Sequence, residues 1–313
     1  MNRPFDEFVF VDYCSDPNAF ACLLEVEERY QFSASQCAAY REALDKAAGF
    51  SNSEDQNADC NSDWRYRIAR WLLKAADELN INRETALIAL MYCDRFMMSR
   101  KIDKQLYQIA SATSLWVASK LYEKKPLKMA ALVSYTQNRW GKEELIAIEE
   151  EILSSNQCLM YPPTPGTFVL LLLNGMSGQS DSLKAIIENS QFLTELASCD
   201  FFFLQYKPST IALAAIFVAL KQDDANIPPE IISPWLESVK AKGLDLENND
   251  TKDCVERLRR IFNANQLHIT MIETKPPSRN AKAPDSSGRV TPSPRESVTI
   301  SSGSKRKCNE MSR

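Results

Sequence analysis

The residue types that most often carry catalysis or bind metals are scarce and scattered along this 313-residue chain. His268 is the single histidine, and none of the nine cysteines forms a Cys-x-x-Cys pair, the spacing typical of zinc and redox sites. The sequence also has no glycine-rich loop of the kind that holds phosphates. We therefore expect no catalytic site, no metal and no other cofactor, and we expect the function to reside in binding surfaces.

Charge divides the chain into an acidic body and a basic end. Residues 275–313 carry nine Lys/Arg against three Asp/Glu, a net +6, and residues 1–274 carry 28 against 38, a net −10. The basic end is rich in Ser and Pro and has no aromatic residue, so we expect a disordered tail. The acidic body argues against nucleic acid as the main partner. No membrane association is expected either, because the longest apolar stretches are too short to cross a bilayer.

Apolar residues at three- and four-residue steps predict helices throughout the body. A stiff, extended segment at residues 161–165 interrupts these helices, because its consecutive X-Pro steps disfavour helix. Upstream of the helices we expect one amphipathic helix over residues 20–30 and a linker over 48–62. The helices expected before the stiff segment span residues 64–79, 82–98, 104–122, 126–135 and 142–159.

The helical pattern after this segment repeats the pattern before it. Leu90–Met97 aligns with Leu196–Phe203, and Ala110–Lys120 aligns with Ile211–Lys221, at offsets of 106 and 101 residues. A repeat of about 100 residues predicts an all-α fold of two tandem five-helix bundles. The alternative is that two apolar helices merely look alike. The predicted regions are an N-terminal helix and linker (1–61), a first bundle (62–161), a second bundle (162–273) and the tail (274–313).

Short motifs in the first unit resemble those of the cyclins, the regulatory subunits of cyclin-dependent protein kinases. The steps from Trp71 to Asp94, from Asp94 to Lys120 and from Lys120 to Glu149 are 23, 26 and 29 residues, similar to the family pattern without insertion. The resemblance is specific over residues 62–165 and looser beyond. The motifs that carry it are Arg65, Trp71-Leu72, Glu84-Thr85, Asp94-Arg95-Phe96, Ala118-Ser119-Lys120, Glu149 and Pro163-Thr164-Pro165.

The resemblance implies a non-catalytic subunit with a groove that receives a kinase. Lys120 and Glu149 would face each other in that groove and bind backbone groups of the kinase, so that its mobile αC helix turns inward. Without the resemblance, these two residues would be an ordinary solvated pair worth under about 1 kcal/mol. Arg65 and Asp94 would form an ion pair that stabilises the first bundle without touching the kinase. By the same analogy, the N-terminal helix would pack on the first bundle and could touch the kinase, and the alternative is a plain solvated helix.

A second implied surface is the patch by which many cyclins recruit Arg-x-Leu peptides. Trp71 and Gln108 match it, whereas Arg67 stands where an aliphatic residue is usual. Lys74 stands where an acid usually pairs with the cation of the peptide. Because a lysine repels arginine, we expect weak or altered docking of kinase substrates and inhibitors at this patch.

The resemblance leaves the cellular role open between two classes. Pro126-Leu127-Lys128 leans towards the D-type branch, and hence towards control of cell-cycle progression in G1/S, although no Leu-x-Cys-x-Glu motif of that branch lies near the N-terminus. The alternative is a transcription-type cyclin or a cyclin-fold scaffold that activates no kinase. The family implies a nuclear location with shuttling to the cytoplasm. In the tail, Thr291 and Ser293 precede prolines and are candidate phosphorylation sites.

Overall fold

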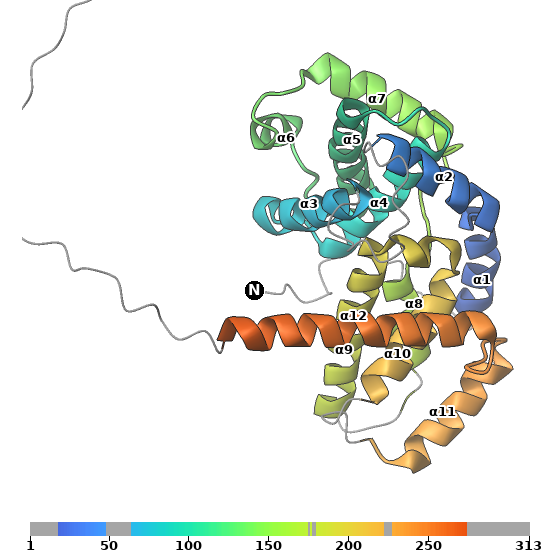
Figure 1. The fold of residues 1–313 in the computed structure, drawn as a ribbon. Coiled ribbons are helices and arrows are strands. Elements are labelled where there is room, and N and C mark those ends of the chain that lie inside the picture. The colour runs from blue at the N-terminus through green and yellow to red at the C-terminus, as the bar shows by residue number, and fades with distance from the viewer. Residues whose placement is uncertain (1–17, 48–63, 175, 177–179, 222–226, 274–313) are drawn as a thin grey trace, which may run out of the picture. The chain divides into compact units, whose positions relative to one another are not determined.

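The structure is a computed structural model that describes residues 18–47, 64–174, 176, 180–221 and 227–273, with no description of the side chains of 180 and 265–273. Within these residues the regular elements are α-helices and one short 3-10 helix, η3 (Phe201–Gln205) (Figure 1). The predicted all-α class is confirmed. The expected linker at 48–62 and the expected tail at 274–313 lie outside the described residues.

Five helices form the first bundle, the number that the sequence predicts. The long helix α5 packs against α4 on one side and α7 on another. Its buried centre is built from small side chains, including Ala110, Ala112 and Ala118, which let neighbouring helices approach closely. The five helices are α3 (Trp64–Leu79), α4 (Arg83–Met98), α5 (Lys104–Tyr122), α6 (Met129–Tyr135) and α7 (Lys142–Ser155).

Two helix boundaries in this bundle differ from the prediction. Helix α6 begins at Met129 rather than at Pro126, because Leu127 donates its backbone N–H to the Ser119 hydroxyl at 3.2 Å and the chain stays extended through Lys128. Helix α7 ends at Ser155 rather than at 159. Gln157 and Cys158 have φ values of 52° and 56°, in the left-handed region, and therefore stop the helix.

Five α-helices and η3 form the second bundle, which confirms the tandem arrangement. Helix α10 packs against both α8 and α9 and is buried on nearly every side, as its continuous apolar sequence requires. Thr164 caps α8 by accepting a bond from the Thr167 N–H at 3.2 Å, so the predicted extended segment leads directly into this helix. The helices are α8 (Pro165–Leu173), α9 (Ser180–Cys199), α10 (Pro208–Leu220), α11 (Pro229–Ala241) and α12 (Asn249–Glu273).

Two helices, not one, precede the first bundle: α1 (Ala19–Tyr30) and α2 (Ala34–Ala47). Ser33 starts α2 with a reciprocal cap, since its hydroxyl accepts from the Gln36 N–H at 3.2 Å while its own N–H donates to the Gln36 side chain at 2.9 Å. Helix α1 meets the expectation of packing on the first bundle only at its C-terminal end, where the Arg29 carbonyl accepts a bond from Arg95 of α4 at 3.0 Å. The buried Leu23 of α1 belongs to the core of the second bundle, whereas Tyr40 and Leu44 of α2 belong to the core of the first.

Candidate functional site

Lys120 and Glu149 are brought together from two helices. Lys120 lies in the last turn of α5, and its ammonium group donates to the Glu149 carboxylate on α7. The same ammonium lies 3.6 Å from the centre of the Trp116 ring, one turn earlier on α5. The Lys120 side chain is 34% exposed and that of Glu149 is 17% exposed. Contacts within the protein therefore hold the two side chains in place, and both remain exposed enough to form further hydrogen bonds.

Core packing and hydrogen bonds fix the helices that carry Lys120 and Glu149. Leu145 and Ile152 of α7, one turn before and nearly one turn after Glu149, are fully buried in the core. Ser119, next to Lys120, donates its hydroxyl to the Trp116 carbonyl at 2.7 Å and holds the Leu127 N–H. Sequence reasoning missed the part played by Trp116. The signal was available, because an aromatic residue four positions before a lysine lies on the same helix face.

The predicted ion pair between Arg65 and Asp94 forms and is buried. The Arg65 guanidinium donates to both carboxylate oxygens of Asp94, at 3.1, 3.1 and 2.9 Å, and Asp94 also accepts from the Tyr40 hydroxyl at 3.2 Å. Burial alone would lower the pKa of Arg65, but the Asp94 carboxylate raises it above the ordinary value, so the guanidinium stays charged. The pair thus joins α2, α3 and α4 in one buried polar network.

Arg65 also reaches the second bundle, which the sequence did not predict. Its Nη1 atom donates to the backbone carbonyls of Ser198 at 3.0 Å and Cys199 at 3.4 Å, at the end of α9. In the second bundle, Asp200 occupies the position that aligns with Asp94, and it accepts a bond from Arg257 at 2.7 Å. Both bundles therefore use an aspartate at the same repeat position to bind an arginine, but only the first pair is sealed from water.

Further contacts between the bundles surround the start of α4. Arg83 pairs with Asp77 of its own bundle and with Glu195 on α9, both at 2.9 Å. The buried Glu84 carboxylate accepts a bond from the Thr164 hydroxyl. Burial raises the pKa of Glu84 to about 7, and the nearby negative charge of Glu195 adds to the shift. Glu84 is therefore a carboxyl group that is half-protonated near neutral pH in the folded protein.

The residues of the expected docking patch are distributed over α3 and α5. Trp71 is half-buried and packs on Tyr135, with ring centres 5.9 Å apart. Lys74 makes a 3.6 Å surface pair with Glu78, worth under about 1 kcal/mol. Gln108 has a buried Oε1 atom without a hydrogen-bond partner among the described atoms. Arg67 is exposed on α3.

Other predicted features can be located only in part. Thr291 and Ser293 lie outside the described residues. Among the residues that the structure describes, no group of three or more His, Cys, Asp or Glu side chains is arranged to hold a metal ion. Within the same residues, no helix combines the length and apolarity that a membrane span requires.

Two protein-family models match this chain. Residues 23–158 match the family described as "Cyclin, N-terminal domain" and residues 163–286 match "Cyclin, C-terminal domain". The chain belongs to the cyclin family. The predicted resemblance is thereby confirmed, and it extends over both bundles and over α1 from Leu23 onward.

Curated relatives come from more than one branch of the cyclins. The chain is 29% identical over 203 residues to the G2/mitotic-specific cyclin C13-1 of Daucus carota, covering 64% of this chain and 58% of the relative. It is 30% identical over 205 residues to the G1/S-specific cyclin-D2 of Mus musculus, covering 64% and 65%. The match therefore spans less than two thirds of either relative, and mitotic and G1/S cyclins match about equally well.

Solved structures with the same fold come from distant sources. The X-ray structure of a viral cyclin from herpesvirus saimiri superposes with a TM-score of 0.58 at 15% identity, covering 77% of this chain and 95% of that one. A chain in the CAK complex of Chaetomium thermophilum bound to ATP-gamma-S gives a TM-score of 0.53 at 15% identity, covering 81% and 84%. At such identities the likeness establishes the double cyclin fold.

Proposed function

We propose that this cyclin is a regulatory subunit that binds a cyclin-dependent protein kinase and activates it without taking part in catalysis. The observation that carries the proposal is the Lys120–Glu149 pair, held against Trp116 on two anchored helices and still partly exposed. Lysine offers three donors and a carboxylate accepts several bonds. Each side chain can therefore hold the other and also bind an exposed backbone group of the kinase.

Activation follows if these bonds favour one conformation of the kinase over another. A cyclin that binds only the conformation with the αC helix turned inward shifts the kinase population towards it. In that conformation the αC glutamate meets the lysine that binds the ATP phosphates. The role of Lys120 and Glu149 is thus to supply binding energy for a rearrangement, and no proton or group is transferred by this chain.

The finer assignment is control of cell-cycle progression in G1/S by a nuclear protein that also visits the cytoplasm, with Thr291 and Ser293 as phosphorylation sites. The support for this assignment is the D-type-like Pro126-Leu127-Lys128 segment and the match to a G1/S-specific relative. Partners would be the kinase and, through the altered patch on α3, substrates or inhibitors of that kinase. Nucleic acid and membranes are not proposed as partners.

The test is to incubate the purified full chain with a panel of cyclin-dependent kinases that includes division and transcription kinases. Complex formation and phosphate transfer to a substrate are measured for each. Activation of a division kinase supports the proposal and names the partner. Activation of transcription kinases alone would replace the cell-cycle assignment, and binding without activation of any kinase would indicate a scaffold.

A further inference from the structure

The repeat position of Lys120 in the second bundle is occupied by Lys221, which also lies against an aromatic ring. Lys221 follows the last residue of α10, and its ammonium group lies 5.0 Å from the centre of the Phe217 ring. Phe217 occupies the position that aligns with Trp116. Both bundles therefore place a lysine four residues after an aromatic residue, at the end of their third helix.

The group that the fifth helix places beside this lysine has the opposite charge in the two bundles. In the first bundle, Glu149 of α7 accepts a hydrogen bond from Lys120. In the second bundle, α12 supplies Arg259, whose guanidinium lies 5.8 Å from the centre of the same Phe217 ring. A base and an acid thus meet in the first bundle, whereas two cations share one ring in the second. We call Lys221 and Arg259 the cation pair.

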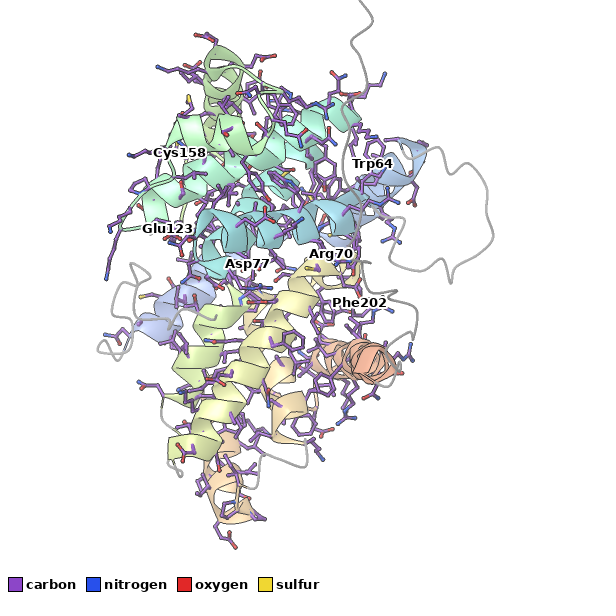
Figure 2. The ribbon with its side chains drawn as sticks, turned by 90° about the vertical axis from the view of Figure 1, so that its left-hand side faces the viewer. Trp64, Arg70, Asp77, Glu123, Cys158 and Phe202 are labelled. Atoms are coloured by element: carbon purple, nitrogen blue, oxygen red, sulfur yellow. The ribbon has the colours of Figure 1, made fainter. Side chains whose placement is uncertain are left out.

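Neither member of the cation pair forms an ion pair with any residue that the structure describes, and both side chains are exposed. Arg257 offers a contrast two residues before Arg259. It also lies over a ring, 5.6 Å from the centre of Phe202, which is labelled in Figure 2 beside α12, seen there nearly along its axis. The other Lys and Arg residues of α12 all have acidic partners: Lys252 pairs with Glu247, Arg257 with Asp200 and Arg260 with Glu256.

Contacts within the protein account for Lys221 but not for a second cation beside it. The end of α10 carries about half a negative charge, which favours a cation at Lys221. Arg259 lies in the middle of α12, where neither helix end favours it. Its contact with the Phe217 ring is worth about 0.5–1 kcal/mol at an exposed site and is opposed by the like charge of Lys221. The two full positive charges exceed the partial charge at the end of α10, so the site can neutralise an external anion.

From these observations, we propose that the cation pair binds a phosphorylated serine or threonine of a partner protein. A phosphate ester carries about −1.5 to −2 charge near neutral pH, which matches two cations better than the single charge of a carboxylate. The planar guanidinium of Arg259 can donate to two phosphate oxygens, and the ammonium group of Lys221 can donate to another. Binding here does not rest on the proposed function, because Lys120 and Glu149 lie in the other bundle.

The test uses the full chain and three fluorescent peptides of twelve residues that differ only at the central position. That position holds phosphoserine, serine or glutamate, and the other residues are uncharged. In fluorescence polarisation, the phosphoserine peptide should bind at least about tenfold more tightly than the serine peptide and more tightly than the glutamate peptide, and added salt should weaken its binding. Equal binding of the phosphoserine peptide and either of the others would overturn the inference, as would no binding of the phosphoserine peptide.

Variants locate the binding. Lys221→Ala with Arg259→Ala should weaken the affinity for the phosphoserine peptide at least about tenfold. The matched control is Lys184→Ala with Lys240→Ala, which removes the same charge from exposed positions of the second bundle. This control should stay within about twofold of the unmodified protein, and an equal loss in both variants would refute the site.

The internal repeat suggests a further variant, Arg259→Glu, which gives the second bundle the charge pattern of Lys120 and Glu149. The new carboxylate should pair with Lys221 and abolish binding of the phosphoserine peptide, and retained binding would contradict the inference. Asp223 and Asp224 follow Lys221 in the sequence and lie outside the described residues. Asp223→Asn with Asp224→Asn should bind the phosphoserine peptide at least as tightly as the unmodified protein, and weaker binding would count against a site made of the two cations.

Circular dichroism checks that each variant is folded. Kinase binding is measured on the same proteins, so that failure of this inference can be told apart from failure of the proposed function.

Discussion

The substitution Asp94→Asn tests how much the buried Arg65–Asp94 pair stabilises the first bundle. It keeps the size of the side chain and removes the negative charge that Arg65 faces. Asp94 has no exposed surface and Arg65 has a side chain that is 4% exposed. Arginine does not lose its proton in proteins, so the variant would leave a buried guanidinium without its counter-charge. Breaking a buried pair in this way costs about 3–5 kcal/mol of unfolding free energy.

The internal repeat supplies the control, Asp200→Asn. The Asp200–Arg257 pair has a similar bond at 2.7 Å, but the Arg257 side chain is 32% exposed. Water can therefore solvate the arginine that is left behind, and we expect a cost of about 1 kcal/mol. A second variant, Arg65→Met with Asp94→Leu, leaves no buried charge and should be less destabilised than Asp94→Asn alone.

Urea unfolding followed by circular dichroism at 222 nm measures these differences. With m-values of about 1–3 kcal/mol per M, Asp94→Asn should lower the midpoint by roughly 1 M or more. A midpoint within about 0.3 M of the unmodified protein would refute the reasoning, because the buried charge would then cost little. An equal loss for Asp200→Asn would refute the argument from burial.

Two further predictions concern the buried carboxylates of Glu84 and Glu27. Glu84→Gln should remove a pH dependence: burial raises the folded-state pKa of Glu84 from 4.5 to about 7, so its stabilising contribution is complete below pH 4.5 and is lost as pH rises towards 7. Between pH 4.5 and pH 7, the unmodified protein should therefore lose up to about 3 kcal/mol more unfolding free energy than the variant. An equal change in melting temperature for the two proteins between pH 5 and pH 8 would contradict this. Glu27→Ala should cost about 2 kcal/mol in urea unfolding, because the buried Glu27 carboxylate caps α10 through the Ser209 N–H at 3.0 Å and hydroxyl at 2.7 Å. Glu28→Ala, which removes only an exposed pair with Lys207, should change the midpoint little, and equal midpoints for the two variants would contradict the capping role.

Local patterns in the sequence predicted the helices of the first bundle, and the resemblance to the cyclins implied the pairs within it. Helix α3 has the predicted bounds, because its apolar residues keep the helical period along its whole length. Arg65 and Asp94 meet where the resemblance implied. The boundary errors at α6 and α7 came from backbone details, a hydrogen bond to Ser119 and left-handed residues at 157 and 158, that the apolar period does not report.

What the sequence could not predict were contacts between residues far apart in the chain. The bonds from Arg65 to Ser198 and Cys199 depend on how the bundles pack, and no local pattern encodes them. The packing of α1 on the second bundle is of the same kind. Helix α2 was different, since Ser33 and Gln36 have the spacing of a capping box and would have revealed its start.

The central claim is that Lys120 and Glu149 bind the kinase, and the dissociation constant of the complex tests it most directly. Lys120→Ala with Glu149→Ala should weaken the affinity for the partner kinase about thirtyfold, because truncated interface anchors commonly cost about 2 kcal/mol or more of binding free energy. Arg100→Ala with Glu151→Ala removes another partly exposed pair that involves α7, at 3.1 Å, and should have little effect. Lys221→Ala, at the aligned position in the second bundle and 5.0 Å from the Phe217 ring centre, should have little effect either. Equal affinity of all four proteins for the kinase would contradict the account.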